Sequence, residues 1–409
     1  MICSGFADHF WREDLMMKAG LDPRTLAVRA GVDSDEQHGA VMPPVYLSSN
    51  FCFEGFGLKR QHDYTRTSNP SRDLLAEALA ELEQGAGAAV TASGMAAVTL
   101  ALELVPLGGR VVAPQDCYGG TYRLLRDRAA AGHYQVDFID QTNTDQVSQA
   151  LSSAASMVWI ETPTNPLLRI VDIKTVAAQA REAGALVVVD NTFLSPALQQ
   201  PLTLGADVVV HSTTKYLNGH SDVVGGAAVS LQSEIAERLA YSANTLGLTG
   251  APFDSFLTLR GLRTLHPRLQ IHEENAMGLA GALLDHEAVK TVHYPGLPEH
   301  PQHGLAKRQQ SGFGGMLSFE LNGGEAAVAQ FVEPLQLFSL AESLGGVESL
   351  VCHPASMTHL PLTPEARADA GIVPGLVRLS VGIEALEDLR NDLRQALDAA
   401  SEHSLGQSN

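Results

Sequence analysis

Six short apolar runs, most of them separated by helical patterns, constrain the fold of this chain more than any other feature. They occupy residues 88–92, 110–113, 135–139, 157–161, 185–190 and 207–211. Strands that alternate with helices form βαβ units, which build a mostly parallel sheet with helices on both faces. A seventh run, 225–230, follows too closely for a crossover helix, so we expect it to pair antiparallel. The sequence therefore predicts an α/β fold around a seven-stranded sheet.

Beyond residue 265 the pattern changes and predicts a smaller C-terminal α+β domain. A long helical stretch through Phe256 and Ile271 leads to strand patterns at 289–294, 316–321, 335–340 and 377–381. Leucines at helical spacing then predict an amphipathic C-terminal helix. At the other end, residues 24–70 are rich in Gly, Pro, Ser and Asn and lack periodicity, which predicts an extended arm. The expected divisions are a tail and arm (1–70), a large domain (71–268) and a C-terminal domain (269–409).

Composition limits the classes of partner. The chain has 409 residues and a formal net charge of -19, which disfavours nucleic acids and anionic membranes as partners. Its cysteines are widely spaced without a Cys-x-x-Cys pair, so we expect no disulfide scaffold or zinc knuckle, and a buried thiol at Cys117. Charged residues interrupt the first twenty positions, and no later run is long and apolar enough to span a bilayer. We therefore expect a cytoplasmic protein.

One lysine stands in a polar loop directly after a predicted strand. The stretch 211–222, HSTTKYLNGHSD, follows the apolar run 206–210. Open α/β sheets bind their ligands at the carboxyl ends of strands. Lys215 has two hydroxyl neighbours, Ser212 and Thr214, as a lysine joined to a phosphorylated carbonyl cofactor would need. Taken alone, such a lysine is more often a solvated surface charge.

Polar groups follow other strands of the predicted sheet. Ser93, Gly94 and Met95 open a helix after the first strand, where backbone N–H groups favour an anion. The same serine also suits an ordinary N-cap. Asp190 ends a strand, where a carboxylate can hold a pyridine nitrogen protonated or can cap a helix.

Two further loops contribute an amide and an aromatic ring. Asn165 lies between two prolines after the run 157–161. Tyr118 precedes Gly119 and Gly120, which would let its ring lie flat on a planar cofactor. A plain loop and simple packing are the alternatives for these segments.

Five segments together carry a family resemblance. They are SGM at 93–95, DCYGG at 116–120, ETPTNP at 161–166, VDNTF at 189–193 and the lysine stretch. Their order resembles that of the Cys/Met-metabolism family of pyridoxal-phosphate enzymes, and the resemblance covers nearly everything from about residue 24 to 400. It implies an aspartate-aminotransferase-like fold, the cofactor pyridoxal 5'-phosphate, and a homotetramer built from dimers that share active sites.

The resemblance also implies roles for individual residues. Lys215 would attach the cofactor, Asp190 would pair with its pyridinium nitrogen, and Tyr118 would stack on the ring and assist proton transfer. The implied phosphate contacts are Ser93, Gly94, Met95, Ser212 and Thr214, completed by Tyr64 and Arg66 from the arm of a neighbouring subunit. The implied substrate contacts are Arg378, which would clamp the α-carboxylate, with Asn165, Glu342, Ser343 and Arg123. No metal site is expected, because His353 and His359 match no metal-ligand spacing.

Within the family, the chain most resembles members that form L-cystathionine by γ-replacement from an O-acylhomoserine, with O-succinylhomoserine favoured, and L-cysteine. The alternative is γ-elimination of cystathionine to cysteine, ammonia and 2-oxobutanoate. Gly120 stands where methionine γ-lyases carry a cysteine, which disfavours methionine as a substrate. A cofactor-binding regulatory protein without catalysis is an alternative of another class, although all the expected catalytic positions are filled.

Overall fold

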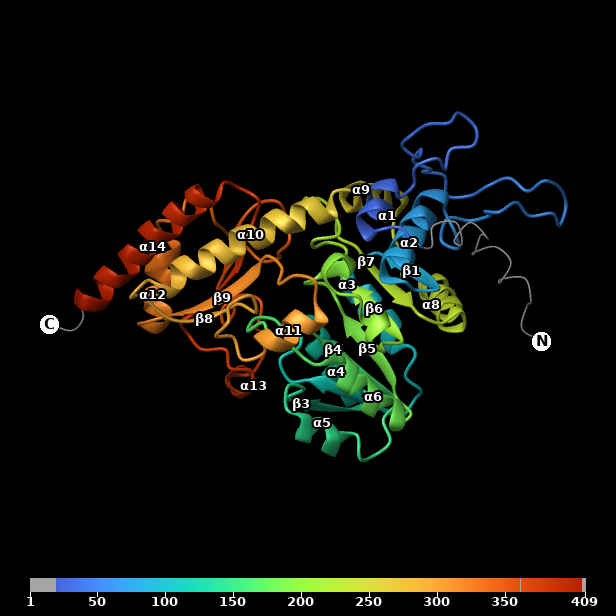
Figure 1. Cartoon of the computed structure of the whole chain (residues 1–409). Coiled ribbons are helices and arrows are strands. Elements are labelled where there is room, and N and C mark those ends of the chain that lie inside the picture. The colour runs from blue at the N-terminus through green and yellow to red at the C-terminus, as the bar shows by residue number, and fades with distance from the viewer. Residues whose placement is uncertain (1–19, 361, 407–409) are drawn as a thin grey trace.

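The computed structural model describes residues 20–360 and 362–406, and a seven-stranded sheet forms the centre of its larger part (Figure 1). The strands are β1 (Gly87–Thr91), β2 (Gly109–Pro114), β3 (Tyr134–Ile139), β4 (Met157–Glu161), β5 (Leu186–Asp190), β6 (Val208–His211) and β7 (Gly226–Ser230). Their order is β1-β7-β6-β5-β4-β2-β3. β7 pairs antiparallel with both β1 and β6, whereas the other pairs are parallel. The predicted α/β fold is confirmed, including the antiparallel seventh strand.

Helices cover both faces of this sheet because its strands are apolar on both sides. Along β5, Val187 and Val189 join one core and Val188 joins the other. The first core is covered by α2 (Pro70–Glu83) and α6 (Ile173–Glu182), and the second by α3 (Gly94–Leu102), α4 (Gly119–Ala130) and α8 (Ser233–Leu246). The short helices α5 (Thr144–Ala150) and α7 (Ser195–Leu198) lie in the connections.

The C-terminal part contains a five-stranded sheet in the order β10-β11-β12-β9-β8. Its strands are β8 (Val289–His293), β9 (Met316–Leu321), β10 (Ser339–Leu340), β11 (Leu350–Cys352) and β12 (Leu376–Ser380). The helices of this half are α9 (Pro252–Leu262), α10 (Leu265–Leu284), α11 (His303–Gln309), α12 (Gly324–Val332), α13 (Pro364–Asp369) and α14 (Leu386–Gly406). Helices α10, α12 and α14 lie on one side of the sheet (Figure 1), where Val377 and Leu379 join the core. Arg378, between them, faces the large sheet.

The expected domain boundary at residue 268 falls inside α10, a helix that connects the two sheets without a break there. The division into 1–70, 71–268 and 269–409 therefore stays a prediction. The expected long helical stretch is in fact two helices, because α9 ends at Leu262 and α10 begins at Leu265.

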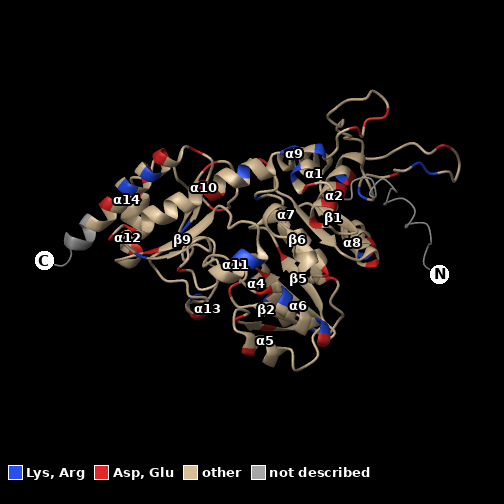
Figure 2. Cartoon of the chain, in the orientation of Figure 1, with Lys and Arg blue, Asp and Glu red and all other residues tan. Residues whose placement is uncertain are grey.

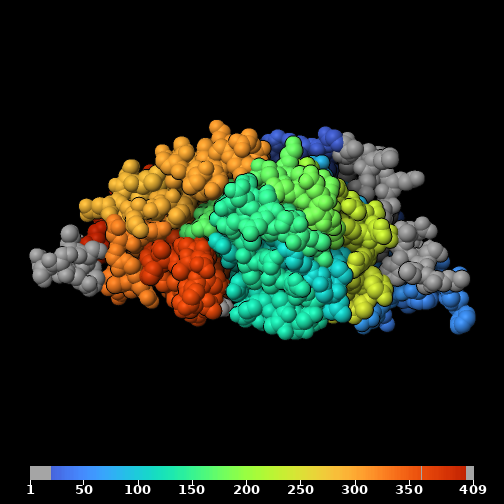
Figure 3. Space-filling model, turned by 90° about the horizontal axis from the view of Figure 1, so that it is seen from below, coloured from blue at the N-terminus to red at the C-terminus, as the bar shows by residue number. Residues whose placement is uncertain are grey.

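The two parts of the chain lie directly against each other. Gln115 Nε2 donates to the Asp369 carbonyl at 3.2 Å, and Ser318 Oγ donates to the Pro166 carbonyl at 2.7 Å. Figure 3 shows the red segment near residues 350–375 beside the teal and green residues of the large sheet. The second sheet therefore meets the large sheet where polar loops follow the large sheet's strands.

The N-terminal arm differs from its predicted form at its beginning. A helix, α1 (Pro23–Arg29), replaces the expected irregular chain, because Asp22 caps it by accepting a hydrogen bond from Arg24 N at 2.8 Å and Pro23 occupies its first turn. After α1 the chain leaves the body in two long loops (Figure 1). These loops expose large apolar side chains, namely Val41, Leu47, Phe53, Phe56 and Leu58. A second subunit as their partner remains a prediction.

Three local details also differ from the prediction. Backbone N–H groups of Gln336, Leu337 and Phe338 donate to the Asp392 carboxylate, so the expected strand over 335–340 is reduced to its last two residues. Strand β11 was not expected, because its three residues are too few for a periodic pattern. A helical pattern over 74–83 followed by Gly85 predicts that this glycine ends the helix, but the left-handed residue at the end of α2 is Gln84, with φ 59°.

Charged side chains lie mainly on outer helices and loops, while the central strands carry few of them (Figure 2). This distribution is expected, because lysine, arginine and carboxylate side chains are rarely buried unless they are paired. The Cys117 thiol is buried, as predicted. In the part of the chain that the structure describes, no helix has the length and apolar character needed to cross a membrane.

Candidate active site

A cavity of about 460 Å³ lies between the strand ends of the large sheet and the C-terminal part. Every sequence-predicted site residue lines it except Tyr64 and Arg66. The lining residues among them are Ser93, Gly94, Met95, Tyr118, Arg123, Asn165, Asp190, Ser212, Thr214, Lys215, Glu342, Ser343 and Arg378. The tertiary structure therefore brings together segments that span nearly 300 positions of the sequence.

Lys215 lies in the loop after β6 with its amine inside the cavity. Its Nζ donates to Ser343 Oγ at 2.6 Å, and Ser343 itself has a left-handed backbone with φ 79°. Burial and, after it, the Arg378 cation lower the pKa of Lys215 to about 8, with Glu342 opposing the shift. About a tenth of the amine is therefore unprotonated at pH 7, far more than for an ordinary lysine, as a nucleophile or base requires.

Asp190 ends β5 and is oriented by the turn that follows. Thr192 N donates to Asp190 Oδ1 at 3.0 Å, and Thr192 Oγ1 accepts a hydrogen bond from Ser212 N at 2.9 Å. Burial raises the pKa of Asp190, and its hydrogen bonds with Thr192 oppose that shift. A buried carboxylate of this kind is suited to a cationic partner, such as a protonated ring nitrogen.

Tyr118 precedes α4, and its backbone is held by the end of β4. Tyr118 N donates to Glu161 Oε2 at 2.8 Å. A Cβ atom at Gly120 would lie 2.6 Å from Tyr118 Cε1 and 2.8 Å from Met95 Sδ, so this position must be glycine for the tyrosine ring to keep its place. A cysteine at residue 120 would not fit without moving that ring.

The N-terminus of α3 and the lysine loop form one end of the cavity. Ser93 caps α3 by accepting a hydrogen bond from Ala96 N at 3.1 Å, so the N-cap interpretation holds and leaves other N–H groups of the first turn facing the cavity. A Cβ atom at Gly94 would lie 2.7 Å from Ser212 Cβ, which shows how closely the helix approaches the loop. Thr214 Oγ1 accepts a hydrogen bond from Gly225 N at 3.0 Å.

Arg378 is buried in the middle strand of the second sheet, 2% exposed, and its guanidinium reaches the cavity. Its Nη1 donates to Asn165 Oδ1 at 2.9 Å and its Nη2 to the Ser343 carbonyl at 3.0 Å. Its Nε is buried without a hydrogen-bond partner among the described residues. A buried cation with a free donor is suited to a carboxylate ligand.

Tyr64 and Arg66 lie on the arm, outside the cavity of their own chain. Arg66 Nε donates to Asn244 Oδ1 at 3.0 Å, and its guanidinium lies over the Tyr64 ring at 5.6 Å. Arg66 is thus held against α8, away from the cavity of its own chain, and a contact of these two residues with a neighbouring subunit's cofactor stays a prediction.

Sequence reasoning assigned no role to two polar residues beside the site. Glu161 lines the cavity, and burial, followed by the negative charge of Asp190, raises its pKa well above the usual range. His359 Nε2 lies 3.0 Å from the Asn165 carbonyl, and burial followed by the Arg378 cation lowers the His359 pKa to about 4. The histidine is therefore neutral and donates this hydrogen bond. The position of Glu161 at a strand end could have indicated a place in the site from the sequence. Nothing in the sequence around His359, apart from its residue type, indicated such a place.

The residues around the cavity fit pyridoxal phosphate. The N–H groups at the start of α3 and the hydroxyls of Ser212 and Thr214 suit a phosphate. The Asp190 carboxylate is suited to a protonated ring nitrogen, and the Tyr118 side chain is suited to stacking on a planar ring. The Lys215 amine is suited to reaction with an aldehyde. One small molecule with these four features accounts for the whole set.

The low pKa of Lys215 predicts a pH dependence in protein freed of cofactor. Amines react only when unprotonated, so the rate of Lys215 acetylation should rise about tenfold per pH unit below pH 8 and level off above it. The folded pKa of about 8 lies below the unfolded value near 10.4, so between these values the unfolded state binds more protons. The free energy of unfolding therefore rises with pH across this window.

Trace acetylation at several pH values, quantified by mass spectrometry of the Lys215 peptide, measures this midpoint. A short lysine peptide is the control and should titrate near pH 10. A Lys215 midpoint equal to that of the peptide would contradict the effect of burial.

Comparisons with known proteins agree with this geometry. Residues 24–398 match the family model described as Cys/Met metabolism PLP-dependent enzyme. A cystathionine gamma-synthase of Escherichia coli is 52% identical over 92% of this chain and 98% of its own length. A cystathionine beta-lyase of Coxiella burnetii is 47% identical over 93% of this chain and 98% of its own length.

The fold has equally similar solved counterparts. A crystal structure of cystathionine gamma synthase from Xanthomonas oryzae pv. oryzae, in complex with aminoacrylate and cysteine, superposes with a TM-score of 0.93. It shares 58% identity, and the match covers 93% of this chain and 99% of that chain. From the family match and these relatives, the chain belongs to the Cys/Met-metabolism family of pyridoxal-phosphate-dependent enzymes.

Proposed function

We propose that this enzyme forms L-cystathionine by γ-replacement from an O-acylhomoserine, with O-succinylhomoserine as the expected donor, and L-cysteine. Two of the three proteins compared above carry the name of that activity, and this is the observation that carries the proposal. Gly120 disfavours methionine as the substrate, because methionine γ-lyases carry a cysteine at that position. Such an enzyme takes part in transsulfuration and methionine biosynthesis.

The proposed roles follow from the chemistry of the side chains. Bound pyridoxal phosphate supplies an electron sink that stabilises negative charge at the substrate Cα. The Lys215 amine attaches the cofactor and then moves protons at Cα, for which a pKa of about 8 is suited. Asp190 would keep the ring nitrogen of the bound cofactor protonated, and Tyr118 would stack on the ring and assist proton transfer.

The substrate is oriented from the C-terminal part of the chain. Arg378, with Asn165, binds the α-carboxylate through its planar donor fork. Glu342, Ser343 and Arg123 line the cavity and are proposed to place the distal end of the substrate and the incoming cysteine. The exposed apolar side chains of the arm support its contact with a second subunit, and the proposed assembly is a tetramer of two dimers that share active sites.

Cystathionine cleavage is the second candidate activity, because one of the compared relatives is named a cystathionine beta-lyase. With water, cleavage at the β-carbon releases pyruvate, ammonia and homocysteine, whereas γ-elimination releases 2-oxobutanoate, ammonia and cysteine. The products therefore separate the two lyase reactions from each other and from synthesis.

Three incubations of the purified holoenzyme test the proposal. One contains O-succinylhomoserine and cysteine, one contains O-succinylhomoserine alone, and one contains cystathionine alone. We expect cystathionine formation in the first to be faster than keto-acid release in the third, measured by chromatography of the amino acids and keto acids. Faster release of 2-oxobutanoate or of pyruvate from cystathionine would replace the synthase assignment by the γ- or β-lyase.

A further inference from the structure

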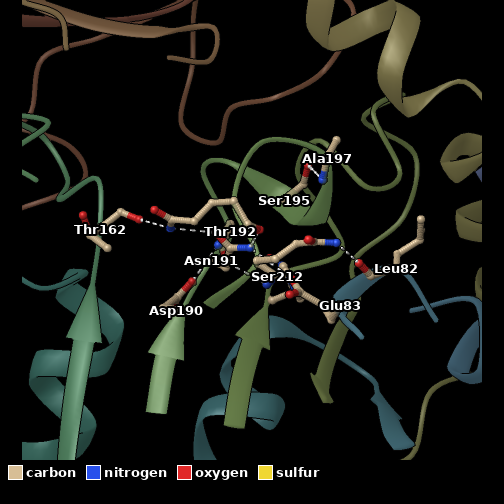
Figure 4. A network of polar contacts seen from close by, with 12 residues as sticks. Leu82, Glu83, Thr162, Asp190, Asn191, Thr192, Ser195, Ala197 and Ser212 are labelled. Carbon is tan, nitrogen blue, oxygen red and sulfur yellow. Dashed lines mark hydrogen bonds and ion pairs between the residues drawn. The ribbon is translucent and has the colours of Figure 1, made fainter. Parts of the chain in front are cut away.

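A buried polar network lies behind the strand ends of the active site (Figure 4). Glu83 is the last residue of α2, and it is fully buried together with His211 and Asn191, each 0% exposed. Glu83 Oε1 lies 2.7 Å from His211 Nε2 and accepts a hydrogen bond from Asn191 Nδ2 at 3.0 Å. A carboxylate only accepts, so His211 donates from Nε2. A single carboxylate oxygen therefore holds two side chains from two neighbouring strand ends.

These two side chains alternate with residues that line the cavity. Asn191 lies between Asp190 and Thr192, and His211 directly precedes Ser212. Successive side chains of an extended chain point to opposite faces, and only Asp190, Thr192 and Ser212 of these five line the cavity. Asp190 and Ser212 reach the site from two turns of the chain. Glu83 therefore holds these two turns by its hydrogen bonds on the opposite face of the sheet, which α2 covers.

The cavity side of the same turns has its own connection. Ser212 N donates to Thr192 Oγ1 at 2.9 Å, which joins the turn after β5 to the turn after β6. Behind the sheet, Glu83 joins the same two turns through Asn191 and His211. The relative position of Asp190 and Ser212 is thus determined from both sides.

Asn191 is fixed by further contacts in this network. Its Nδ2 also donates to the Gln199 carbonyl at 2.8 Å, and its Oδ1 accepts a hydrogen bond from Gln199 Nε2 at 3.0 Å. The same Nε2 donates to the Thr162 carbonyl at 3.1 Å, in the loop after β4. The network therefore reaches three adjacent strand ends, and Glu83 is the carboxylate within it.

Stability alone is a weak reason for a carboxylate at this position. A buried ionic group can often be replaced by apolar residues of similar volume without loss of stability. Glu83 Oε2 and His211 Nδ1 are buried and have no hydrogen-bond partner within the described part of the chain. What the carboxylate does provide is one acceptor that two separate turns share.

We propose that Glu83 is a positioning residue for the cofactor site. It acts through Asn191 and His211 to fix the position of Asp190 relative to Ser212. It touches neither substrate nor cofactor. The inference rests on the cofactor dependence of the family and on the proposed cofactor contacts of Asp190 and Ser212, and not on which substrate the enzyme uses.

The experiment measures the dissociation constant of pyridoxal 5'-phosphate for full-length variants, by absorbance titration without substrate. Glu83→Leu removes the shared acceptor, and we expect the constant to rise about tenfold or more, since small misplacements of binding groups have effects of this size. Glu83→Gln keeps an acceptor oxygen for both donors, and we expect a value within about threefold of wild type. Rescue by glutamine would separate hydrogen-bonded positioning from mere filling of space.

Two further variants make the test independent of folding defects. Leu79→Ala opens a cavity one turn earlier in α2 and removes none of the network's hydrogen bonds, so it should lower the melting temperature and leave the dissociation constant within about twofold of wild type. Asn191→Ala keeps the pair between Glu83 and His211, and should raise the constant about fivefold even if Glu83→Leu does not fold.

The kcat and KM of the variants, measured in the reaction that the wild-type enzyme catalyses, supply a second readout. The network holds Asp190 and Ser212 and makes no hydrogen bond to Arg378, so Glu83→Leu should lower kcat about tenfold at saturating cofactor and leave KM within about threefold of wild type. Unchanged cofactor affinity in Glu83→Leu or Asn191→Ala would overturn the proposal. An equal loss of affinity in Leu79→Ala would do so as well, because it would assign the effect to general destabilisation.

Discussion

Replacing Lys215 by alanine is expected to lower turnover by about four orders of magnitude or more, because one side chain supplies both the attachment of the cofactor and the proton transfer. The variant should still bind pyridoxal phosphate without a covalent bond. After borohydride reduction and denaturation, the wild-type protein should retain the cofactor on the peptide that contains Lys215, whereas the variant should retain none.

The matched control for this experiment is Lys290→Ala, which changes an exposed lysine whose side chain is 64% accessible. This control should keep both the covalent link and the activity. A cofactor that remains attached to Lys215→Ala after reduction would assign the link to a different lysine. A wild-type protein that is colourless and inactive would contradict the proposed site as a whole.

Replacing Arg378 by lysine is expected to raise KM for the amino-acid substrate about 10- to 100-fold with a smaller change in kcat, because hydrogen bonds to charged groups contribute about 1.5–3 kcal/mol. Lysine keeps the charge and loses the planar fork. It also leaves the Asn165 oxygen or the Ser343 carbonyl without its present donor. Steady-state kinetics with the donor substrate measure this effect.

Arg126→Lys is the control for the arginine experiment, because it makes the same change in an arginine whose side chain is 48% exposed on α4. Its kinetic constants should match those of the wild type. If Arg378→Lys raised cofactor dissociation and left KM unchanged, the arginine would belong to the cofactor site instead of the carboxylate site.

The strand ends of the large sheet were predictable because their positions follow from a local pattern. Short apolar runs identified the strands, and parallel strands in such folds end at a common edge. Asp190 and the residues after β6 could therefore be placed together before any contact was known. Local turn chemistry also contained the signal for α1, in Asp22 and Pro23, but the glycine- and proline-rich surroundings obscured it.

Other features depended on contacts that no local pattern encodes. Glu83 and His211 are 128 residues apart in sequence, and Asn165 and Arg378 are 213 apart. Arg378 would be a solvated edge charge by its sequence context, yet its strand lies between β11 and β9 and it is buried. These pairs form only when separate helices and strands pack together.

The sequence by itself determined the parallel sheet and the polar strand ends, including the loop that carries Lys215, because the burial of a strand or helix face repeats with a short period that can be read locally. Only the tertiary structure decided that Arg378 faces Asn165, that Glu83 lies behind Asp190, and that Tyr64 lies outside its own cavity. The physical reason is that these relations depend on how elements pack across the sheets, and packing is set by the whole core.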